Sequence, residues 1–290
     1  MKKVIGIIGL GLLGGSMAKA LHEYTDYSVV GYARRQEICD MALADGVVDA
    51  AFTNIEDMLA VADVLVFSLP PDTNARLFEK IAPKLRPGMI ITDVSSAKKN
   101  FVEAVHAHIP EGVFFVSLHP MAGSEKGGYE MATADIFQGA TWIVLEEEHP
   151  SFSEEIALEF EEMGKAFGSR IERVKLSEHD AYLARVSHMP HLIASMVAMV
   201  AGSDEKGEFR MRLAAGGFRD VTRVAGGNPS MWREIIKGND VEVSAALAEM
   251  AKEIDLVQEL LSRDDEGASV EAYLAHAKDV RDRFSEIYKK

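Results

Sequence analysis

The sequence predicts an α/β fold, in which a Rossmann-like doubly wound parallel sheet is followed by an all-α C-terminal domain. Two observations carry this prediction. Up to residue 173, short β-branched or apolar runs alternate with helical patterns, as in repeated β-then-α units. After Lys175 the strand signals stop and only helical patterns follow. We therefore expect one domain over residues 1–173 and a second, helical domain over residues 174–290.

The elements of the first half follow from hydrophobic periodicity and turn residues. Strands are expected at Lys3–Ile8, Tyr27–Tyr32, Val64–Leu69, Met89–Asp93, Val113–Val116, Thr141–Leu145 and Arg170–Val174. Helices are expected at Ser16–His22, Gln36–Asp45, Asn54–Val61, Thr73–Leu85, Asn100–His108 and Ser153–Phe167.

The second half is predicted to contain only helices. They are expected at Glu178–Ala201, Gly207–Ala215, Phe218–Ala225, Ser230–Lys237, Asp240–Ser262 and Ser269–Tyr288. Pro190 should kink or interrupt the first of them, because proline lacks a backbone donor. Asn228 and Pro229 form an N-cap followed by proline at the first helical position.

Composition limits the classes of function. The chain has 290 residues, 48% of them hydrophobic and 27% charged, which is typical of a globular protein. Its single cysteine, Cys39, excludes an internal disulfide and a cysteine-rich metal site, and we expect no metal. The net charge of −15 argues against nucleic acid or an anionic membrane as a partner. An anionic substrate would therefore need a local basic pocket.

The N-terminus resembles a secretory signal, with two lysines, an apolar run and Ala18-Lys19-Ala20. Glycines at motif spacing argue against that interpretation. No other stretch is expected to be long and apolar enough to span a membrane, and the helical stretch Ile193–Ala201 is too short and has polar flanks. We expect a cytoplasmic protein.

A glycine-rich turn follows the first strand, with the GxGxxG spacing of Gly9, Gly11 and Gly14. These glycines permit a tight turn, close approach of a pyrophosphate, and close packing of strand and helix. A strand before, a helix after and a second strand at the expected distance support a dinucleotide-binding domain. The expected cofactor contacts are completed by Leu12 and Leu13, whose N–H groups open the helix, and by Ser68.

The residue after the second strand bears on the choice of cofactor. An acidic residue there would bind the ribose 2′-hydroxyl of NAD, but the chain has Ala33 followed by Arg34 and Arg35. Guanidinium groups suit a 2′-phosphate. The sequence favours NADP, with NAD possible if both arginines are only surface residues.

A polar stretch, Ser117–Gly128, follows the strand expected at Val113–Val116. Ligands of a doubly wound sheet bind beyond the carboxyl ends of its strands, so His119 should lie at a strand exit and face a cleft, with Pro120 fixing a turn. An imidazole there can hold or accept a proton near neutral pH. His119 is therefore the first candidate for a catalytic base.

The motifs together resemble the prephenate/arogenate dehydrogenase family of tyrosine biosynthesis, over nearly the whole chain. The matching segments are Gly9–Gly14, Thr92–Lys98, His119–Glu125, Ser187–His191, Gly217–Arg223 and Met231–Arg233. One departure is Ser95-Ser96-Ala97-Lys98, where the family more often has Gly-Ser-Val-Lys.

The resemblance implies oxidative decarboxylation of prephenate to 4-hydroxyphenylpyruvate, with hydride transfer to NAD(P). His119 would accept the hydroxyl proton and Ser96 would hold the substrate oxygen. The dicarboxylate substrate calls for cations, and Arg223 is one candidate. The substrate pocket would also include His191, Glu125, Trp232 and Lys98. A homodimer through the helical domain is also expected.

Alternatives remain open for individual residues. Ser96 could cap the following helix, Arg223 could pair with Asp220, and Glu125 could pair with Lys126. His191 and Trp232 could be core residues.

Alternatives also remain for the function as a whole. They are an arogenate dehydrogenase, a β-hydroxyacid dehydrogenase and an NADP-binding sensor without turnover. The second usually relies on a lysine in the helical half, but no motif surrounds Lys175.

Overall fold

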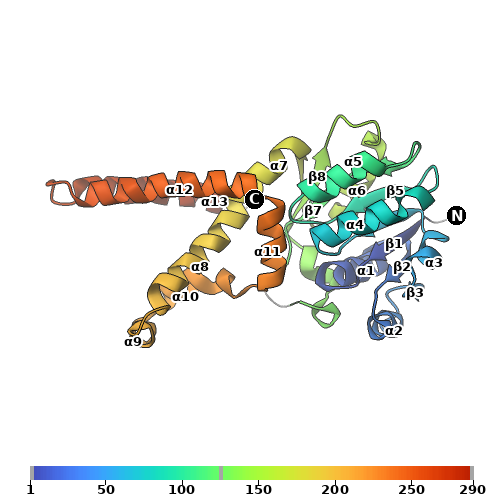
Figure 1. Ribbon diagram of the computed structural model, residues 1–290, viewed down its shortest axis with the longest axis horizontal. Coiled ribbons are helices and arrows are strands. Elements are labelled where there is room, and N and C mark those ends of the chain that lie inside the picture. The colour runs from blue at the N-terminus through green and yellow to red at the C-terminus, as the bar shows by residue number, and fades with distance from the viewer. Residues whose placement is uncertain (1–2, 124–126, 288–290) are drawn as a thin grey trace. The chain divides into compact units, whose positions relative to one another are not determined.

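The computed structural model describes residues 3–123 and 127–287 (Figure 1). Two compact units make up the chain, residues 1–240 and residues 241–290. The predicted boundary at residue 173 falls inside the first unit.

A six-stranded parallel sheet organises the first unit, with the strand order β3-β2-β1-β4-β5-β6. Its strands are β1 (Val4–Ile8), β2 (Ser28–Tyr32), β3 (Ala50–Phe52), β4 (Val64–Phe67), β5 (Ile90–Asp93) and β6 (Phe114–Phe115). This order confirms the predicted doubly wound sheet. Only the three-residue strand β3 was not expected.

Helices connect these strands. They are α1 (Leu12–Tyr24), α2 (Gln36–Ala44), α3 (Ile55–Leu59), α4 (Pro71–Ile81), η1 (Ala82–Lys84) and α5 (Lys99–His108). Two hydrophobic clusters cover the two faces of the sheet. Side chains of β4 alternate between them, since Val64 and Val66 pack with α1 and α2, whereas Leu65 and Phe67 pack with α3, α4 and α5. This two-residue period is what a strand buried on both faces requires.

A second, three-stranded sheet has the order β7-β8-β9 and consists of β7 (Leu118–Pro120), β8 (Thr141–Glu146) and β9 (Arg170–Lys175). β7 runs antiparallel to β8, and β8 runs parallel to β9. Between them lie η2 (Tyr129–Met131), η3 (Ala134–Phe137) and α6 (Glu154–Ala166).

This sheet corrects the expectation for His119. The residue does follow the end of β6, as expected, but it lies inside a further strand, β7, where it pairs with Ile143 and is only 5% exposed. Pro120 is also a strand residue, not part of a turn, and pairs with Trp142. A proline is tolerated there because β7 is the edge strand of its sheet.

All elements that the structure describes after residue 175 are helical, as predicted. In the first unit they are α7 (Leu176–Leu183), η4 (Ala184–His188), α8 (Met189–Gly202), α9 (Gly207–Leu213), α10 (Gly216–Thr222), η5 (Arg223–Gly226) and α11 (Pro229–Gly238). The side chain of Asn228 accepts hydrogen bonds from the backbone N–H groups of Ser230 and Met231, which confirms the predicted N-cap.

Pro190 does not interrupt its helix, so of the two predicted outcomes, a kink or an interruption, the interruption is wrong. Residues Leu176–Gly202 form one helix in which η4 is a π-helical turn, with the N–H of Met189 bonded to the carbonyl of Ala184 five residues earlier. The wider turn lies immediately before Pro190 and accommodates it. This helix is also longer than Ile193–Ala201 and, by length and composition alone, would be able to cross a membrane.

The second unit is a pair of long helices. Helix α12 covers Asp240–Leu261 and begins at the last residue of the first unit, and α13 covers Ala268–Ile287. Gly267 connects them with φ of +87°, a left-handed conformation that favours glycine.

Candidate active site

The turn between β1 and α1 has the geometry of a phosphate-binding loop. Gly9 has φ of +100°, and a Cβ added to Gly14 would lie 2.0 Å from the carbonyl oxygen of Gly9. A Cβ at Gly11 would meet open space, and Gly11 caps α1 without a side-chain hydrogen bond. The first N–H groups of α1, from Leu12 and Leu13, are therefore available to an anion. The geometry of these residues fits the pyrophosphate of a dinucleotide.

Three further predicted cofactor residues, Ser68, Arg34 and Arg35, lie near this loop or at the same sheet edge. Ser68 follows β4, and its Oγ would lie 3.1 Å from a Cβ added to Gly14. Ala33 follows β2 and is buried, whereas Arg34 and Arg35 are exposed. No ion pair is formed by either arginine with another residue in the described ranges, 3–123 and 127–287.

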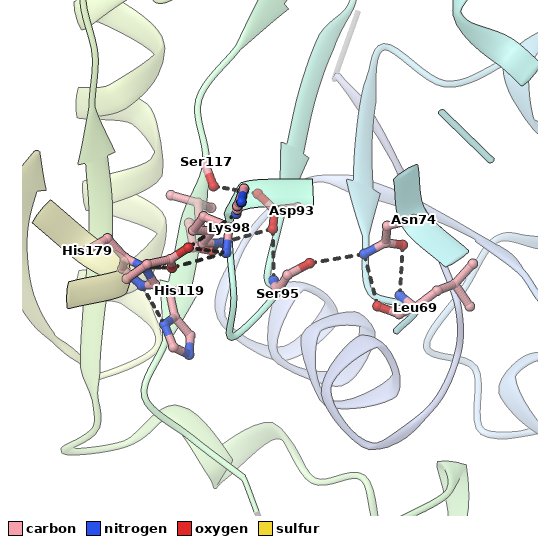
Figure 2. A network of polar contacts seen from close by, with 11 residues as sticks. Leu69, Asn74, Asp93, Ser95, Lys98, Ser117, His119 and His179 are labelled. Carbon is pink, nitrogen blue, oxygen red and sulfur yellow. Dashed lines mark hydrogen bonds and ion pairs between the residues drawn. The ribbon is translucent and has the colours of Figure 1, made fainter. Parts of the chain in front are cut away.

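A buried polar network joins the ends of three strands (Figure 2). Its centre is Asp93 at the end of β5, which accepts hydrogen bonds from Ser95 N–H, Ser117 Oγ and Lys98 Nζ. Lys98 Nζ lies 2.8 Å from Asp93 and 2.6 Å from the carbonyl oxygen of Leu118 in β7. Asn74 extends the network by donating to Ser95 Oγ.

The network gives Lys98 a structural role that the sequence did not indicate. Burial lowers the pKa of its ammonium, and the negative charge of Asp93 opposes that shift. Two of its three donors are bound inside the protein, one of them on the carbonyl that precedes His119. Lys98 therefore fixes the strand that carries His119, and its predicted contact with substrate remains a prediction.

Three side chains form a second chain of hydrogen bonds. His119 Nδ1 lies 2.9 Å from His179 Nε2, and His179 Nδ1 lies 2.8 Å from a carboxylate oxygen of Asp180. His179 is fully buried, and both His179 and Asp180 belong to α7. Figure 2 shows His179 beside His119.

The carboxylate of Asp180 determines which ring nitrogens of His179 and His119 carry hydrogen. Its carboxylate also accepts the N–H groups of Lys98 and Lys99 at the start of α5. Although burial acts to raise its pKa, these hydrogen bonds and that of His179 lower it, so the group is ionised. A carboxylate only accepts, so His179 carries its hydrogen on Nδ1.

The tautomer of His119 follows from that of His179. Because Nδ1 of His179 carries the hydrogen, its Nε2 is a lone pair that accepts from Nδ1–H of His119. The Nε2 atom of His119 is then unprotonated. Burial, together with the charges of His179, Lys98 and His188, holds the pKa of His119 well below its ordinary value. His119 is therefore a neutral imidazole with a free basic nitrogen near pH 7.

Ser96 lies in the loop between β5 and α5, half-buried, two residues before Lys98. It does not cap α5, because the side chain of the N-cap residue, Lys98, makes no capping bond and Asp180 accepts the free N–H groups instead. Its hydroxyl is thus not used by the helix.

Helices α8 and α11 bring a second group of predicted residues together. The rings of His191 and Trp232 are stacked with centroids 3.6 Å apart and an angle of 12° between planes. A Cβ on Gly227 would lie 2.5 Å from Nε1 of Trp232, so only glycine fits beside the stack. Burial lowers the pKa of His191, and a hydrogen bond to the backbone of Val224 opposes the shift.

Arg223 begins η5, next to the residue whose backbone binds His191, and its side chain is exposed. Asp220 lies 3.8 Å from Arg219 instead, and in the part of the chain that the structure describes Arg223 forms no ion pair. Its guanidinium is free to bind a carboxylate. Glu125 lies outside the described residues.

These observations give a dinucleotide loop, a buried neutral histidine, an aromatic stack and an exposed arginine one residue before the backbone that binds His191. Two family models match the chain. One for the nucleotide-binding domain of prephenate dehydrogenase matches residues 17–168, and one for its dimerization domain matches residues 175–276. Prephenate dehydrogenase of Bacillus subtilis is 30% identical over 285 residues, 97% of this chain and 76% of that protein. The chain belongs to the prephenate dehydrogenase family.

Solved structures of the family have the same fold. Prephenate dehydrogenase from A. aeolicus, in complex with hydroxyphenyl propionate and NAD+, superposes with a TM-score of 0.87 at 27% identity, covering 98% of this chain and 99% of that one. Arogenate dehydrogenase from Synechocystis superposes with a TM-score of 0.83 at 26% identity, covering 97% and 99%. This member of the prephenate dehydrogenase family is thus a nicotinamide-dinucleotide-dependent enzyme.

Sequence reasoning missed part of the site in this dehydrogenase. It did not single out His179, Asp180, His188 or Asn239, although all four are in or beside the hydrogen-bonded chain. The only signal for His179 and Asp180 was a histidine next to a carboxylate at the start of a helical pattern, which is common on protein surfaces.

Proposed function

We propose that this enzyme oxidatively decarboxylates prephenate to 4-hydroxyphenylpyruvate. The observation that carries the proposal is the chain Asp180–His179–His119, which leaves a basic nitrogen on a buried neutral imidazole. The bound nicotinamide would accept the hydride from the ring carbon that carries the hydroxyl. The protein itself would supply the groups that bind the carboxylates of the substrate and the group that accepts its hydroxyl proton.

His119 Nε2 is proposed to accept the hydroxyl proton as the C–O bond acquires carbonyl character. The hydride leaves that ring carbon, and carbon dioxide leaves the opposite one. The electron pair of the broken C–C bond enters the ring, which becomes aromatic, and the phenolate oxygen takes its proton back from Nε2 of His119, so no net proton is released or consumed. Ser96 is proposed to hold the same oxygen through its hydroxyl, which the helix does not use.

The two carboxylates of the substrate require cations in an acidic protein. Arg223 is proposed to bind one of them, because its guanidinium forms no ion pair among the described residues and the residue directly precedes Val224, whose backbone binds His191. The stacked rings of His191 and Trp232 are proposed to form the wall of the same pocket, with Gly227 leaving room for them.

Prephenate is favoured over arogenate by the carboxylates of the site. Arogenate carries an ammonium that would need a carboxylate partner. Asp93 is bonded to Lys98 and Ser117, and Asp180 is bonded to His179 and the start of α5. Both carboxylates are therefore already neutralised or hydrogen-bonded.

NADP is proposed as the preferred form of the cofactor. Ala33 offers no carboxylate for the ribose hydroxyls, and the exposed Arg34 and Arg35 follow it at the carboxyl end of β2. A guanidinium in that position can bind a 2′-phosphate with two parallel hydrogen bonds.

A homodimer is proposed from the match to a dimerization domain and from the surface of α8. Met199 and Val200 are 63% and 80% exposed, and such contiguous apolar surface is typical of a protein interface. The predicted cytoplasmic location remains a prediction.

The function is tested by steady-state kinetics with purified protein. Prephenate and arogenate are each supplied with NAD and NADP, and the reduced cofactor is followed by absorbance. We expect the highest kcat/KM with prephenate and NADP, together with release of carbon dioxide. Cofactor binding without turnover of either substrate would contradict the proposal.

A further inference from the structure

His188 is a buried histidine that the proposed mechanism does not use. It is 1% exposed and lies at the end of the π-helical turn η4, one helical turn before His191. Such π-turns are rare and frequently mark functional sites. Its ring lies edge-on to Trp232, with centroids 6.4 Å apart.

Asn239 fixes the orientation and tautomer of His188. Its side-chain nitrogen Nδ2 lies 2.7 Å from the carbonyl oxygen of Asp180 and 3.1 Å from Nδ1 of His188. A carbonyl oxygen only accepts, so the atom that faces it must be the amide nitrogen. That nitrogen also donates to His188, whose Nδ1 is therefore the lone pair and whose Nε2 carries the hydrogen.

The Nε2–H of His188 is a buried donor without a hydrogen-bond partner among residues 3–123 and 127–287. A buried donor without a partner is costly, so this N–H is expected to have a partner when the site is in use. The residues around His188 indicate where the hydrogen-bond partner of this N–H would lie. Trp232 lies on one side, and His119 is close enough for the charge of His188 to affect its pKa.

We propose that His188 is a substrate-binding residue whose Nε2–H donates a hydrogen bond to an oxygen of the substrate. This inference rests on the proposed function, in which the substrate lies between His119 and Trp232. The charged and titratable groups near His188 are Asp180, His179 and His119, and burial lowers the pKa of His188 to about 4. The donor is therefore a neutral N–H at neutral pH, and it is complementary to a carboxylate or carbonyl oxygen.

Two substitutions separate this role from a structural one. His188→Gln keeps a donor near the position of Nε2 and loses the acceptor for Asn239. His188→Asn keeps an acceptor near the position of Nδ1 and loses the donor. If the donor binds substrate, kcat/KM with prephenate should fall less than about fivefold in the glutamine variant. It should fall about ten- to hundredfold in the asparagine variant, the range for a hydrogen bond to a charged group.

The same two variants can contradict the inference. A larger loss in His188→Gln than in His188→Asn would show that the histidine only orients Asn239. Equal losses, or no loss in either variant, would also overturn it. Cofactor affinity, measured by fluorescence of the reduced dinucleotide, should be unchanged in both variants.

A measurement on the unsubstituted protein keeps the inference testable if a variant does not fold. In a 15N-histidine spectrum at pH 7, His188 should be protonated at Nε2 and not at Nδ1. Addition of hydroxyphenylpropionate with cofactor should move the Nε2–H signal downfield. An unchanged signal with bound ligand would overturn the inference. Because this readout needs no turnover, it is independent of whether prephenate is the substrate.

Discussion

Nδ1 of His119 lies 2.9 Å from Nε2 of His179, although the two residues are 60 positions apart in the chain. The pair joins an edge strand of the small sheet to the first helix of the helical half. This contact determines the protonation pattern of His119, because His179 is itself held by an ionised carboxylate. The proposed catalytic base is thus held by contacts between strand β7 and helix α7.

Asp180→Asn should lower kcat with prephenate by roughly ten- to thousandfold. An amide no longer requires the hydrogen of His179 to be on Nδ1, so His119 is no longer held in the tautomer with a free Nε2. Loss of part of the cap on α5 should cost only about 1 kcal/mol of stability. The matched control is Asp204→Asn, an exposed carboxylate paired with Arg210, which should not change kcat. If Asp180→Asn has normal kcat, Asp180 does not fix the tautomer.

Arg223→Ala should raise KM for prephenate by about ten- to hundredfold and leave cofactor affinity unchanged. The reason is loss of one charge-assisted hydrogen bond, worth roughly 1.5–3 kcal/mol. Arg219→Ala is the matched control, because Arg219 is exposed, one turn earlier, and beside Asp220. Equal KM values for prephenate in the two variants would show that Arg223 does not bind the substrate.

Stability should fall as the pH falls from 7.5 to 5. Burial lowers the pKa values of His119, His179 and His188 in the folded protein. Below the ordinary histidine pKa near 6.5, the unfolded chain therefore binds more protons than the folded protein, and the free energy of unfolding decreases. For His188 alone, a folded pKa of about 4 corresponds to a loss of roughly 2 kcal/mol at pH 5.

Urea unfolding at the two pH values measures this loss. His188→Asn should show a smaller difference between pH 7.5 and pH 5 than the unsubstituted protein. Equal free energies of unfolding at both pH values would contradict the burial of neutral histidines.

The double change Ala33→Asp with Arg34→Ala should shift the cofactor preference from NADP to NAD. The carboxylate would accept the ribose hydroxyls and repel a 2′-phosphate, and the lost guanidinium removes a contact worth about ten- to hundredfold in affinity. The comparison is kcat/KM for each cofactor, with Arg34→Ala alone as an intermediate variant. An unsubstituted enzyme that prefers NAD tenfold or more would show that Arg34 and Arg35 are only surface charges.

Much of the sheet could be predicted because local patterns specify it. The first β-to-α turn is indicated directly by the spacing of Gly9, Gly11 and Gly14. The order of the elements follows from the alternation of apolar runs with helical patterns. The three-residue strand β3 was missed because so short a run has no measurable period. β7 was missed because Pro120 indicates a turn unless the strand is known to be at a sheet edge.

The candidate site was predictable only in part. His119 and Arg223 occur in recognisable motifs, but the environment that makes His119 a base depends on contacts between distant residues. Lys98 illustrates the same limit. The family resemblance implies a substrate contact for this lysine, and the sequence did not indicate that its ammonium is also buried against Asp93, five residues earlier. A buried ammonium requires a carboxylate partner, and that partner is only evident once the strands are assembled.

The central claim, that His119 is the base in oxidative decarboxylation of prephenate, is tested most directly by kcat of His119→Asn. We predict a fall of roughly two to four orders of magnitude with cofactor affinity unchanged, since the amide has no basic nitrogen to accept the hydroxyl proton. A variant that turns over prephenate at close to the normal rate would contradict the claim.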